Sequence, residues 1–285
     1  MRQISRRDLS LVLANAESDL SAMRGASVLI TGTTGFVGSW LVESAVHANT
    51  EAGAELRIFA AVPPECDVAR DAPHLAALPD VTFVRGDIRT WTAADVAAQC
   101  DGRLAFDAVI HTAIMVDAAT IAANPLPTLE SAVEGTRRTL EIARAAGARR
   151  FLLLSSGAVY GRQPAGLAAM GESFSGALDP MDPASVYAEG KRIGETMCAC
   201  ANRAQGIETV AARAFAFVGP HLPLDRHFAV GSSSVMRSLV APSSCAATER
   251  RSGRTCTQPT WQPGSGHCSR AGRRAARTTS GHRRG

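Results

Sequence analysis

Long hydrophobic runs are missing from this sequence of 285 residues. No apolar stretch approaches the roughly 20 residues that a membrane-spanning helix needs. Residues 5–11 have the form of a twin-arginine export signal, but the apolar stretch at 9–14 is too short, and polar residues interrupt the chain directly after it. We therefore predict no membrane partner, a cytoplasmic location and an amphipathic helix over 8–23, within an N-terminal segment 1–23.

Paired cysteines are also lacking. The seven cysteines are odd in number and contain no C-x-x-C pair, so their spacing indicates neither a disulfide framework nor a zinc site, which suits a reducing cytosol. Cys256, His267 and Cys268 are close in sequence, but no fourth ligand lies at a usual spacing. We predict no metal site.

The C-terminal segment 232–285 lacks the residues that build a core. It has no Ile, Phe or Tyr, and its only leucine is Leu239. This segment contains ten arginines and one acidic residue, Glu249, so its net charge is +9. The preceding part of the chain therefore has a net charge of −5, which gives the overall +4. Such a segment cannot bury enough apolar area to offset the entropy of ordering, and we predict that it is disordered.

The body, by contrast, alternates apolar β-type stretches with helical ones. This alternation predicts an α/β fold with a doubly wound parallel sheet, in one domain over 24–231. The expected strands are 26–31, 56–62, 81–85, 108–111, 151–155 and 208–213, and the expected helices of the body are 36–48, 94–99, 127–146 and 187–205.

A glycine loop, G-x-x-G-x-x-G, joins the first expected strand to the first helix of the body. Gly32 permits a tight turn, Gly35 lets the backbone approach a pyrophosphate, and Gly38 lets the helix pack closely on the strand. The helix start supplies N–H groups and partial positive charge to the phosphates. A glycine-rich turn without a ligand is the alternative. We predict a dinucleotide site formed by Gly32, Thr34, Gly35, Phe36, Val37 and Gly38.

Asp87 and Ile88 follow the third strand. The carboxylate of Asp87 can accept from an adenine amino group while Ile88 packs on the ring, although a solvated turn aspartate is the plain alternative. Thr112 and Ala113, after the fourth strand, are assigned to the same site. The second strand ends without an Asp or Arg at its tip, and Glu65 lies further along. NAD is favoured as the cofactor, and NADP stays open.

Tyr187 and Lys191 form a Tyr-x-x-x-Lys pair on one face of the last expected helix. A free phenol has a pKa near ~10, and a nearby ammonium favours the phenolate. Lys191 can also hold ribose hydroxyls. Ser156 can hydrogen-bond a substrate oxygen as hydride leaves or reaches the adjacent carbon. We predict that Ser156, Tyr187 and Lys191 are catalytic, and that Tyr187 and Lys191 also contact the cofactor.

These motifs resemble those of the extended short-chain dehydrogenases/reductases that act on nucleotide sugars. The resemblance implies a Rossmann sheet with NAD or NADP, a smaller C-terminal substrate domain, a nucleotide-sugar substrate, a homodimer, and chemistry through a 4-keto sugar in which Tyr187 takes the hydroxyl proton. The matching positions are Thr31 to Gly38, Asp87, Ser156, Tyr187, Lys191, and the R-x-F-x-x-x-G-P stretch at Arg213, Phe215, Gly219 and Pro220.

The sequence departs from the family in two places. Ala132 stands where the family often has Asn, and Gly157 and Ala158 stand where dehydratases carry acidic residues. The second departure favours epimerase or keto-reductase chemistry over dehydration. Residues 189–192 (E-G-K-R), however, resemble UDP-glucuronate decarboxylases, so that activity is the alternative.

Residues 227–231 resemble the family's entry to its substrate domain, but the segment after them does not continue it. Codons for 247–279 can be chosen so that another frame reads G-D-G-T-A-V-R-S-Y-L-Y-A-A-D-L-A, which follows the family's order. We therefore favour a reading-frame shift that impairs activity. The competing interpretation is a non-catalytic NAD-binding protein with a basic nucleic-acid-binding tail. With Trp261 as the only aromatic in the tail, a nucleic-acid partner is disfavoured.

Overall fold

The computed structural model describes residues 3–115, 118–215, 217–222 and 268–270. The strands are β1 (Ser27–Thr31), β2 (Arg57–Val62), β3 (Val81–Arg85), β4 (Ala108–His111), β5 (Arg150–Ser156), β6 (Glu208–Ala214) and β7 (Cys268–Arg270). The longer helices are α1 (Arg6–Ser21), α2 (Phe36–Ala52), α7 (Leu126–Ala145) and α8 (Val186–Gln205). Short helices are α3 (Val68–Asp71), α4 (Pro73–Ala76), α5 (Ala93–Ala98) and α6 (Ala118–Ala123), with single 3-10 turns η1 (Gly157–Tyr160) and η2 (Pro183–Ser185).

The strands form one sheet in the order β3-β2-β1-β4-β5-β6-β7. The six strands from β1 to β6 pair in parallel, which confirms the predicted doubly wound fold. The chain leaves the sheet's centre in both directions from β1 and β4. In such sheets a ligand binds at this reversal point, outside the carboxyl ends of the strands.

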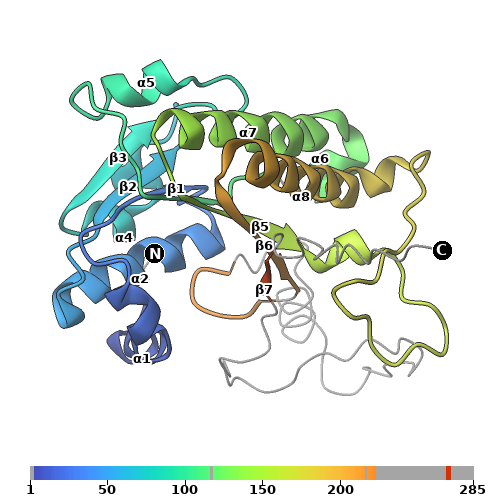
Figure 1. The fold of residues 1–285 in the computed structure, drawn as a ribbon, viewed down its shortest axis with the longest axis horizontal. Helices are drawn as coiled ribbons and strands as arrows, with labels where there is room; N and C mark the ends of the chain where they lie inside the picture. The colour runs from blue at the N-terminus through green and yellow to red at the C-terminus, as the bar shows by residue number, and fades with distance from the viewer. Residues whose placement is uncertain (1–2, 116–117, 216, 223–267, 271–285) are drawn as a thin grey trace, which may run out of the picture.

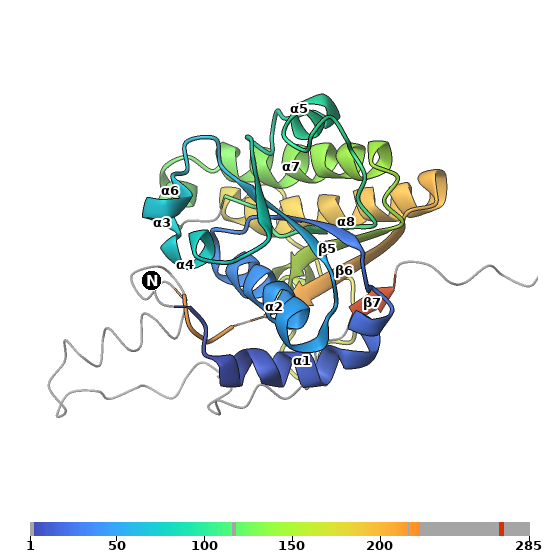
Figure 2. The same ribbon diagram turned by 90° about the vertical axis from the view of Figure 1, so that its left-hand side faces the viewer.

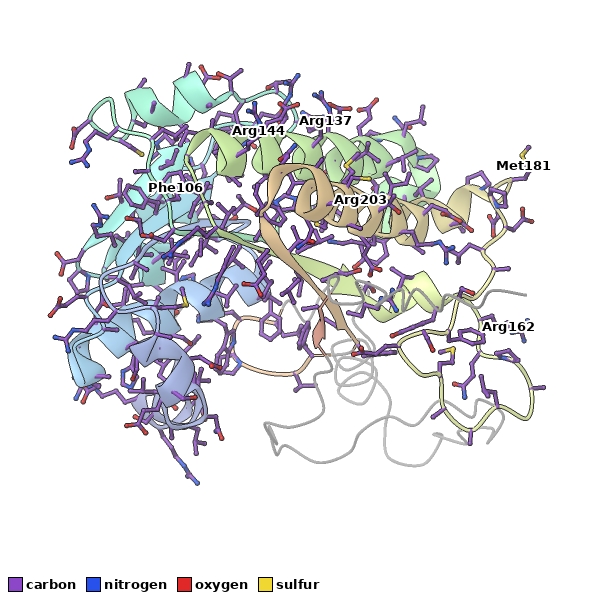
Figure 3. All side chains as sticks on the ribbon, in the orientation of Figure 1. Phe106, Arg137, Arg144, Arg162, Met181 and Arg203 are labelled. Atoms are coloured by element: carbon purple, nitrogen blue, oxygen red, sulfur yellow. The ribbon has the colours of Figure 1, made fainter. Side chains whose placement is uncertain are left out.

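Helices cover both faces of the sheet (Figure 1), with α7 and α8 on one face and α2 on the other. One buried cluster joins the sheet to α7 and α8 and includes Phe106 and Phe151. Phe106, labelled in Figure 3, contacts Phe59 edge-on with ring centroids 5.0 Å apart. A second cluster lies between the sheet and α2 and includes Val42 and Ile58. The parallel strands are buried on both faces, so β1 is apolar along most of its length.

The N-terminal helix α1 packs against α2, on the side away from the sheet (Figure 2). The Ser5 hydroxyl caps it by accepting from the Asp8 N–H at 3.2 Å. The helix ends at Ser21, earlier than predicted. Ahead of it, Ile4 is buried and its N–H donates to the Glu43 carboxylate on α2 at 2.7 Å.

Most of the tail that was predicted to be disordered lies outside the described residues. Its described part, β7, pairs antiparallel with β6 over Cys268–Arg270, and disorder of the tail stays a prediction. Strand pairing uses backbone N–H and C=O groups, and an edge strand such as β6 offers these to any extended segment. Low apolar content therefore did not exclude a short strand there.

Across the described ranges, no helix is both long and apolar enough to cross a membrane. Four cysteines in these ranges, Cys66, Cys100, Cys198 and Cys200, are free thiols. The four-residue helices α3 and α4 were not predicted, because a single turn has too few positions to show a 3.6-residue period; the six-residue α6 was also missed.

Candidate cofactor and active site

A cavity of about 520 Å³ lies at the carboxyl ends of the central strands. Its walls come from the loops after β1, β2, β3 and β4, from the end of β5 and from the start of α8. The structure brings every predicted site residue to this cavity: Gly32, Thr34, Gly35, Phe36, Val37, Gly38, Asp87, Ile88, Thr112, Ala113, Ser156, Tyr187 and Lys191 all line it.

The glycine loop has the close contacts that its spacing predicted. Gly32 adopts φ +73°, and a Cβ on it would lie 2.7 Å from the backbone nitrogen of Ala113. A Cβ on Gly38 would lie 2.1 Å from the Gly32 carbonyl oxygen, so α2 can start against this loop only with glycine there. Gly35 is the N-cap residue of α2 and provides no side-chain cap, which leaves the first-turn N–H groups of the helix for an anion. These features fit a dinucleotide.

Three polar residues tie β1 to β4 beneath the cavity. The Thr112 hydroxyl donates to the Thr31 carbonyl at 2.6 Å, and the Thr31 hydroxyl lies 2.8 Å from His111 Nδ1. His111 is fully buried, and burial, followed by the charge of Lys191, lowers the pKa of His111 to about 3. The ring is therefore neutral, and it fixes the strand ends without adding charge near the cofactor.

Asp87 and Arg89 form a two-pronged ion pair on the cavity wall. Arg89 Nε donates to both Asp87 oxygens, at 3.0 and 3.1 Å, and one terminal nitrogen donates at 2.6 Å. The guanidinium holds the pKa of Asp87 below its usual range. Glu65 lines the same cavity, although its distance along the chain had counted against it. Arg89 was missed, and its place two residues after Asp87 was the available signal.

Ser156 ends β5 and starts a tight turn. Its hydroxyl oxygen accepts from the Ala158 N–H at 3.1 Å, which orients the side chain at the strand's end. A Cβ on Gly157 would lie 2.4 Å from the Phe215 ring, so a side chain at this position, where dehydratases carry an acidic residue, would displace that ring. The absence of that acidic side chain therefore leaves room for an aromatic wall.

Lys191 links α8 to β5. It is 4% exposed, and its Nζ donates to the Leu154 carbonyl at 2.6 Å. Burial lowers the pKa of Lys191 to about 8, against the opposing effects of Cys198 and Glu195. Tyr187 lies one turn earlier on α8, and both side chains reach the cavity. The ammonium group of Lys191 is thus buried away from water, one helical turn from Tyr187.

The departure at Ala132 also has a structural setting. A Cβ on Gly190 would lie 2.6 Å from the Ala132 Cβ, so α7 and α8 approach closely at this point. Gly190 lies between Tyr187 and Lys191 on α8. The close approach of α7 and α8 at Gly190 therefore helps to position both side chains at the site. A longer side chain at residue 132 would occupy the space that the contact uses.

Aromatic residues that the sequence analysis did not assign form another wall. Phe215 and Phe217 follow β6 and line the cavity, with Phe217 6.1 Å from Phe36 between ring centroids. Phe215 stacks on Tyr160 at 6.2 Å and is 69% exposed. The R-x-F stretch in the sequence pointed to Phe215, but the stretch alone did not indicate what Phe215 does.

The doubly wound sheet, the glycine loop and the Tyr-x-x-x-Lys helix at one cavity define a dinucleotide-binding Rossmann protein. Residues 28–242 match the NAD dependent epimerase/dehydratase family. The chain belongs to that family. The predicted family and fold class are confirmed, and the cofactor in the family's description is the one that the sequence favoured.

Curated relatives include UDP-glucuronic acid decarboxylase 1 of Arabidopsis thaliana, 30% identical over 201 residues, which are 70% of this chain and 41% of that protein. The decarboxylase 1 of Xenopus tropicalis is 28% identical over 70% of this chain and 42% of its own length. The chain thus spans about two fifths of these relatives.

Solved structures with a similar fold include a UDP-galactose 4-epimerase, 26% identical with a TM-score of 0.53, over 69% of this chain and 58% of the other. Another is the Thermus thermophilus UDP-glucose 4-epimerase in complex with NAD, 24% identical with a TM-score of 0.56, over 73% and 60% of the two chains. The second of these supports the fold alone.

Proposed function

We propose that this cavity binds NAD and that the protein is a nucleotide-sugar enzyme of the epimerase type. The observation that carries the proposal is that the glycine loop, Ser156, Tyr187 and Lys191 line one cavity although up to 159 positions separate Gly32 from Lys191 in the sequence. Unrelated motifs would have no reason to meet at the carboxyl ends of the strands.

The chain's own residues account for binding and proton transfer. The N–H groups at the start of α2 hold the pyrophosphate, and Lys191 holds ribose hydroxyls with its ammonium. NAD, when bound, supplies the acceptor for hydride from the sugar. Tyr187 takes the hydroxyl proton from the sugar, Lys191 lies one helical turn from Tyr187 on the same helix, and Ser156 donates a hydrogen bond to the same sugar oxygen.

The charge of the far wall favours NAD over NADP. Glu65 follows β2 and lines the cavity, and an acidic residue after the second strand is a usual acceptor for a ribose diol. A 2′-phosphate there would meet this carboxylate. Arg89 is the cation on the same wall, but both Asp87 oxygens already bind it. Its charge is therefore largely neutralised.

Decarboxylation of UDP-glucuronate is the second candidate, because the curated relatives carry that name and residues 189–192 read E-G-K-R. The first candidate draws on the solved 4-epimerases. A product assay separates the two. Two proteins are assayed with a panel of UDP-, dTDP-, GDP- and CDP-sugars. One is the full chain, and the other is a version in which the downstream reading frame is restored. Epimerised sugar supports the first candidate, and CO₂ from UDP-glucuronate supports the second.

Tyr187→Phe tests the role of the phenol in whichever activity is found. We expect a loss of at least about 100-fold in kcat, the usual contribution of a general base. Thr196→Val is the matched control, since it also removes a hydroxyl from α8 but on an exposed turn. Unchanged turnover in Tyr187→Phe would contradict the role. Turnover of none of these sugars, with NAD bound, would support the non-catalytic alternative.

The homodimer stays part of this proposal. Light scattering coupled to gel filtration measures the mass of the full chain and of the frame-restored chain. We expect twice the mass of one chain for the restored form, and a single-chain mass would contradict the dimer.

A further inference from the structure

Three titratable side chains meet outside the cofactor cavity. They are Glu43 on α2, His74 on α4 and His221 in the segment after β6, and we call them the Glu-His-His cluster. One ligand atom from each lies within 4.8 Å of the other two. None of the three lines the cofactor cavity. The residues are far apart in sequence, so no spacing rule for metal ligands could have found them.

The cluster is buried and its polar atoms are poorly satisfied. Glu43 and His74 are 2% and 3% exposed, and the side chain of His221 is 5% exposed. Within the described ranges, Glu43 Oε1, His74 Nδ1 and His221 Nε2 have no hydrogen-bond partner. Glu43 Oε1 and His221 Nε2 face each other at 3.3 Å without hydrogen-bond alignment. A buried polar atom without a partner destabilises the fold unless something binds it.

Neighbouring hydrogen bonds fix which atoms are free. The Ser39 hydroxyl donates to the Thr33 carbonyl at 3.0 Å, so its oxygen accepts from His74 Nε2 at 3.3 Å. His74 therefore carries its proton on Nε2, and the lone pair of Nδ1 is free. The other oxygen of Glu43 is already used by the Ile4 N–H at 2.7 Å. One oxygen of Glu43 and one nitrogen of His74 are left for a ligand.

The electrostatics of the cluster disfavour its own charged forms. Burial raises the pKa of Glu43 and lowers that of His221. Burial, then the charge of His221, lowers the pKa of His74 to about 4. The two imidazole rings stack with centroids 4.3 Å apart, an arrangement that suits neutral rings. Neutral imidazoles are the form that binds a divalent cation, and Glu43 loses its proton when the cation binds.

We propose that the Glu-His-His cluster binds a divalent transition-metal ion, with Zn²⁺ the best match. Two imidazoles and one carboxylate form a three-ligand zinc set, with a fourth position for water. Ligand atoms about 2.0–2.1 Å from a tetrahedral zinc lie about 3.3 Å apart. The Glu43–His221 pair is already at 3.3 Å, and the ligand atoms of all three residues lie within 4.8 Å of one another.

An ion here joins segments that border the cofactor cavity. It would tie α2 and α4 to the segment that carries Phe217, and through Glu43 to the N-terminal residues at Ile4. Trp40 Nε1 already donates to the Pro220 carbonyl at 3.0 Å, next to His221. Through Ser39 the cluster also contacts Thr33 of the glycine loop. The role assigned to the ion is therefore structural: it holds one wall of the cavity.

The test measures Zn²⁺ binding to the full chain after removal of metal with a chelator. Cys245, Cys256 and Cys268 are first changed to Ser, so that tail thiols cannot supply ligands. In that background we expect one Zn²⁺ per chain by calorimetry and elemental analysis, and a rise in Tm on adding Zn²⁺. Glu43→Gln, His74→Gln and His221→Gln should each weaken binding at least tenfold. Ser39→Ala should weaken it about tenfold, as loss of a supporting hydrogen bond does.

His47→Gln is the matched control. His47 is a buried histidine like His74, but it lies on α2 outside the cluster, and its ring contacts the Ser10 hydroxyl at 3.2 Å. This variant should bind Zn²⁺ like the parent. Where a cluster variant fails to fold, the parent loaded with Co²⁺ decides: its visible spectrum should be that of a four-coordinate N/O site. No Zn²⁺ binding by the folded parent, equal binding by folded cluster variants, or a thiolate-to-Co²⁺ band would each overturn the proposal.

Discussion

At the scale of single residues, Lys191 has the most testable chemistry. It is the only lysine in the sequence, and burial lowers its pKa to about 8. Reductive methylation with ¹³C-formaldehyde should therefore label Lys191 and the N-terminal amine alone. We expect the Lys191 signal to titrate near pH 8 in the folded chain. Titration at the ordinary value of 10.5 would contradict the buried position.

The same lysine predicts how stability depends on pH. A lysine whose pKa falls on folding binds its proton more tightly when unfolded, so its protonation opposes folding. The stabilising contribution is complete above pH 10.5 and is lost as the pH falls through about 8. The shift from 10.5 to about 8 corresponds to about 3 kcal/mol at roughly 1.36 kcal/mol per pKa unit.

Urea unfolding of the cofactor-free wild type and Lys191→Met, between pH 7.5 and 9.5, checks this prediction. The free energy of unfolding of the wild type should rise relative to that of the variant as the pH increases. The variant removes the one group in question while other titrating groups are shared by both proteins. A difference that does not change with pH would contradict the prediction.

The sequence could predict most of the residues that line the cavity because they belong to local motifs with a chemical reason. It could not predict Glu65, Phe215 or the Glu-His-His cluster in the same way. Glu65 reaches the cavity through the path of the loop after β2, and Phe215 through its stacking on Tyr160. These positions depend on tertiary packing, which leaves no fixed spacing in the chain.

At the scale of elements, the approach of α7 to α8 positions the helix that carries Tyr187 and Lys191. Gly190→Leu should push α8 away from Ala132 and displace Tyr187 and Lys191. We expect NAD affinity to fall at least tenfold, as measured by calorimetry. Gly171→Ala is the control, since a Cβ there meets nothing within 4 Å. Equal affinities for both variants would show that the approach of the helices does not set the site.

The Glu195–Arg213 ion pair ties α8 to β6. Arg213 donates to Glu195 at 2.6 and 2.9 Å, and Ser155 donates to the same carboxylate at 2.5 Å. The two side chains are 16% and 20% exposed. Removing one partner leaves a largely buried charge unpaired, so Glu195→Ala should cost about 3 kcal/mol of unfolding free energy.

A double-mutant cycle with Arg213→Ala measures the coupling in this pair. The double variant should lose much less than the sum of the single losses, because no unpaired charge remains. The exposed pair of Arg24 and Glu55 is the comparison, and its cycle should give no measurable coupling. Additive losses at Glu195 and Arg213 would contradict the account.

Helix and strand positions could be predicted from the sequence wherever an element was long enough to show its period. The six parallel strands were found in order, with ends within a few residues. The single-turn helices and β7 were missed. Their formation depends on capping residues such as Asp67 and on an open edge of the sheet at β6.

At the scale of the whole molecule, the reading-frame hypothesis has a direct consequence. Phe215 and Val218, after β6, are 69% and 58% exposed. In the frame-restored protein we expect further chain to cover this apolar surface. The full chain should therefore aggregate more readily than the restored one in light scattering, and it should turn over nucleotide sugars more slowly. Equal behaviour would contradict this prediction.

Sequencing the gene is the companion test. The hypothesis predicts that the frame overlapping residues 247–279 encodes the G-D-G-T-A-V-R-S-Y order. A downstream frame without that order would refute it. In that case a salt-dependent affinity of the arginine-rich tail for nucleic acid becomes the better hypothesis, because phosphate contacts weaken as salt rises.

The most direct test of the central claim is a titration of the full chain with NAD and NADP by calorimetry, with circular dichroism to establish folding. The account predicts binding of one NAD per chain, with NADP weaker. In Gly38→Ala, where the added Cβ would lie 2.1 Å from the Gly32 carbonyl oxygen, affinity should fall at least tenfold, whereas Gly171→Ala should bind normally. A folded wild-type chain that binds neither dinucleotide would contradict the account.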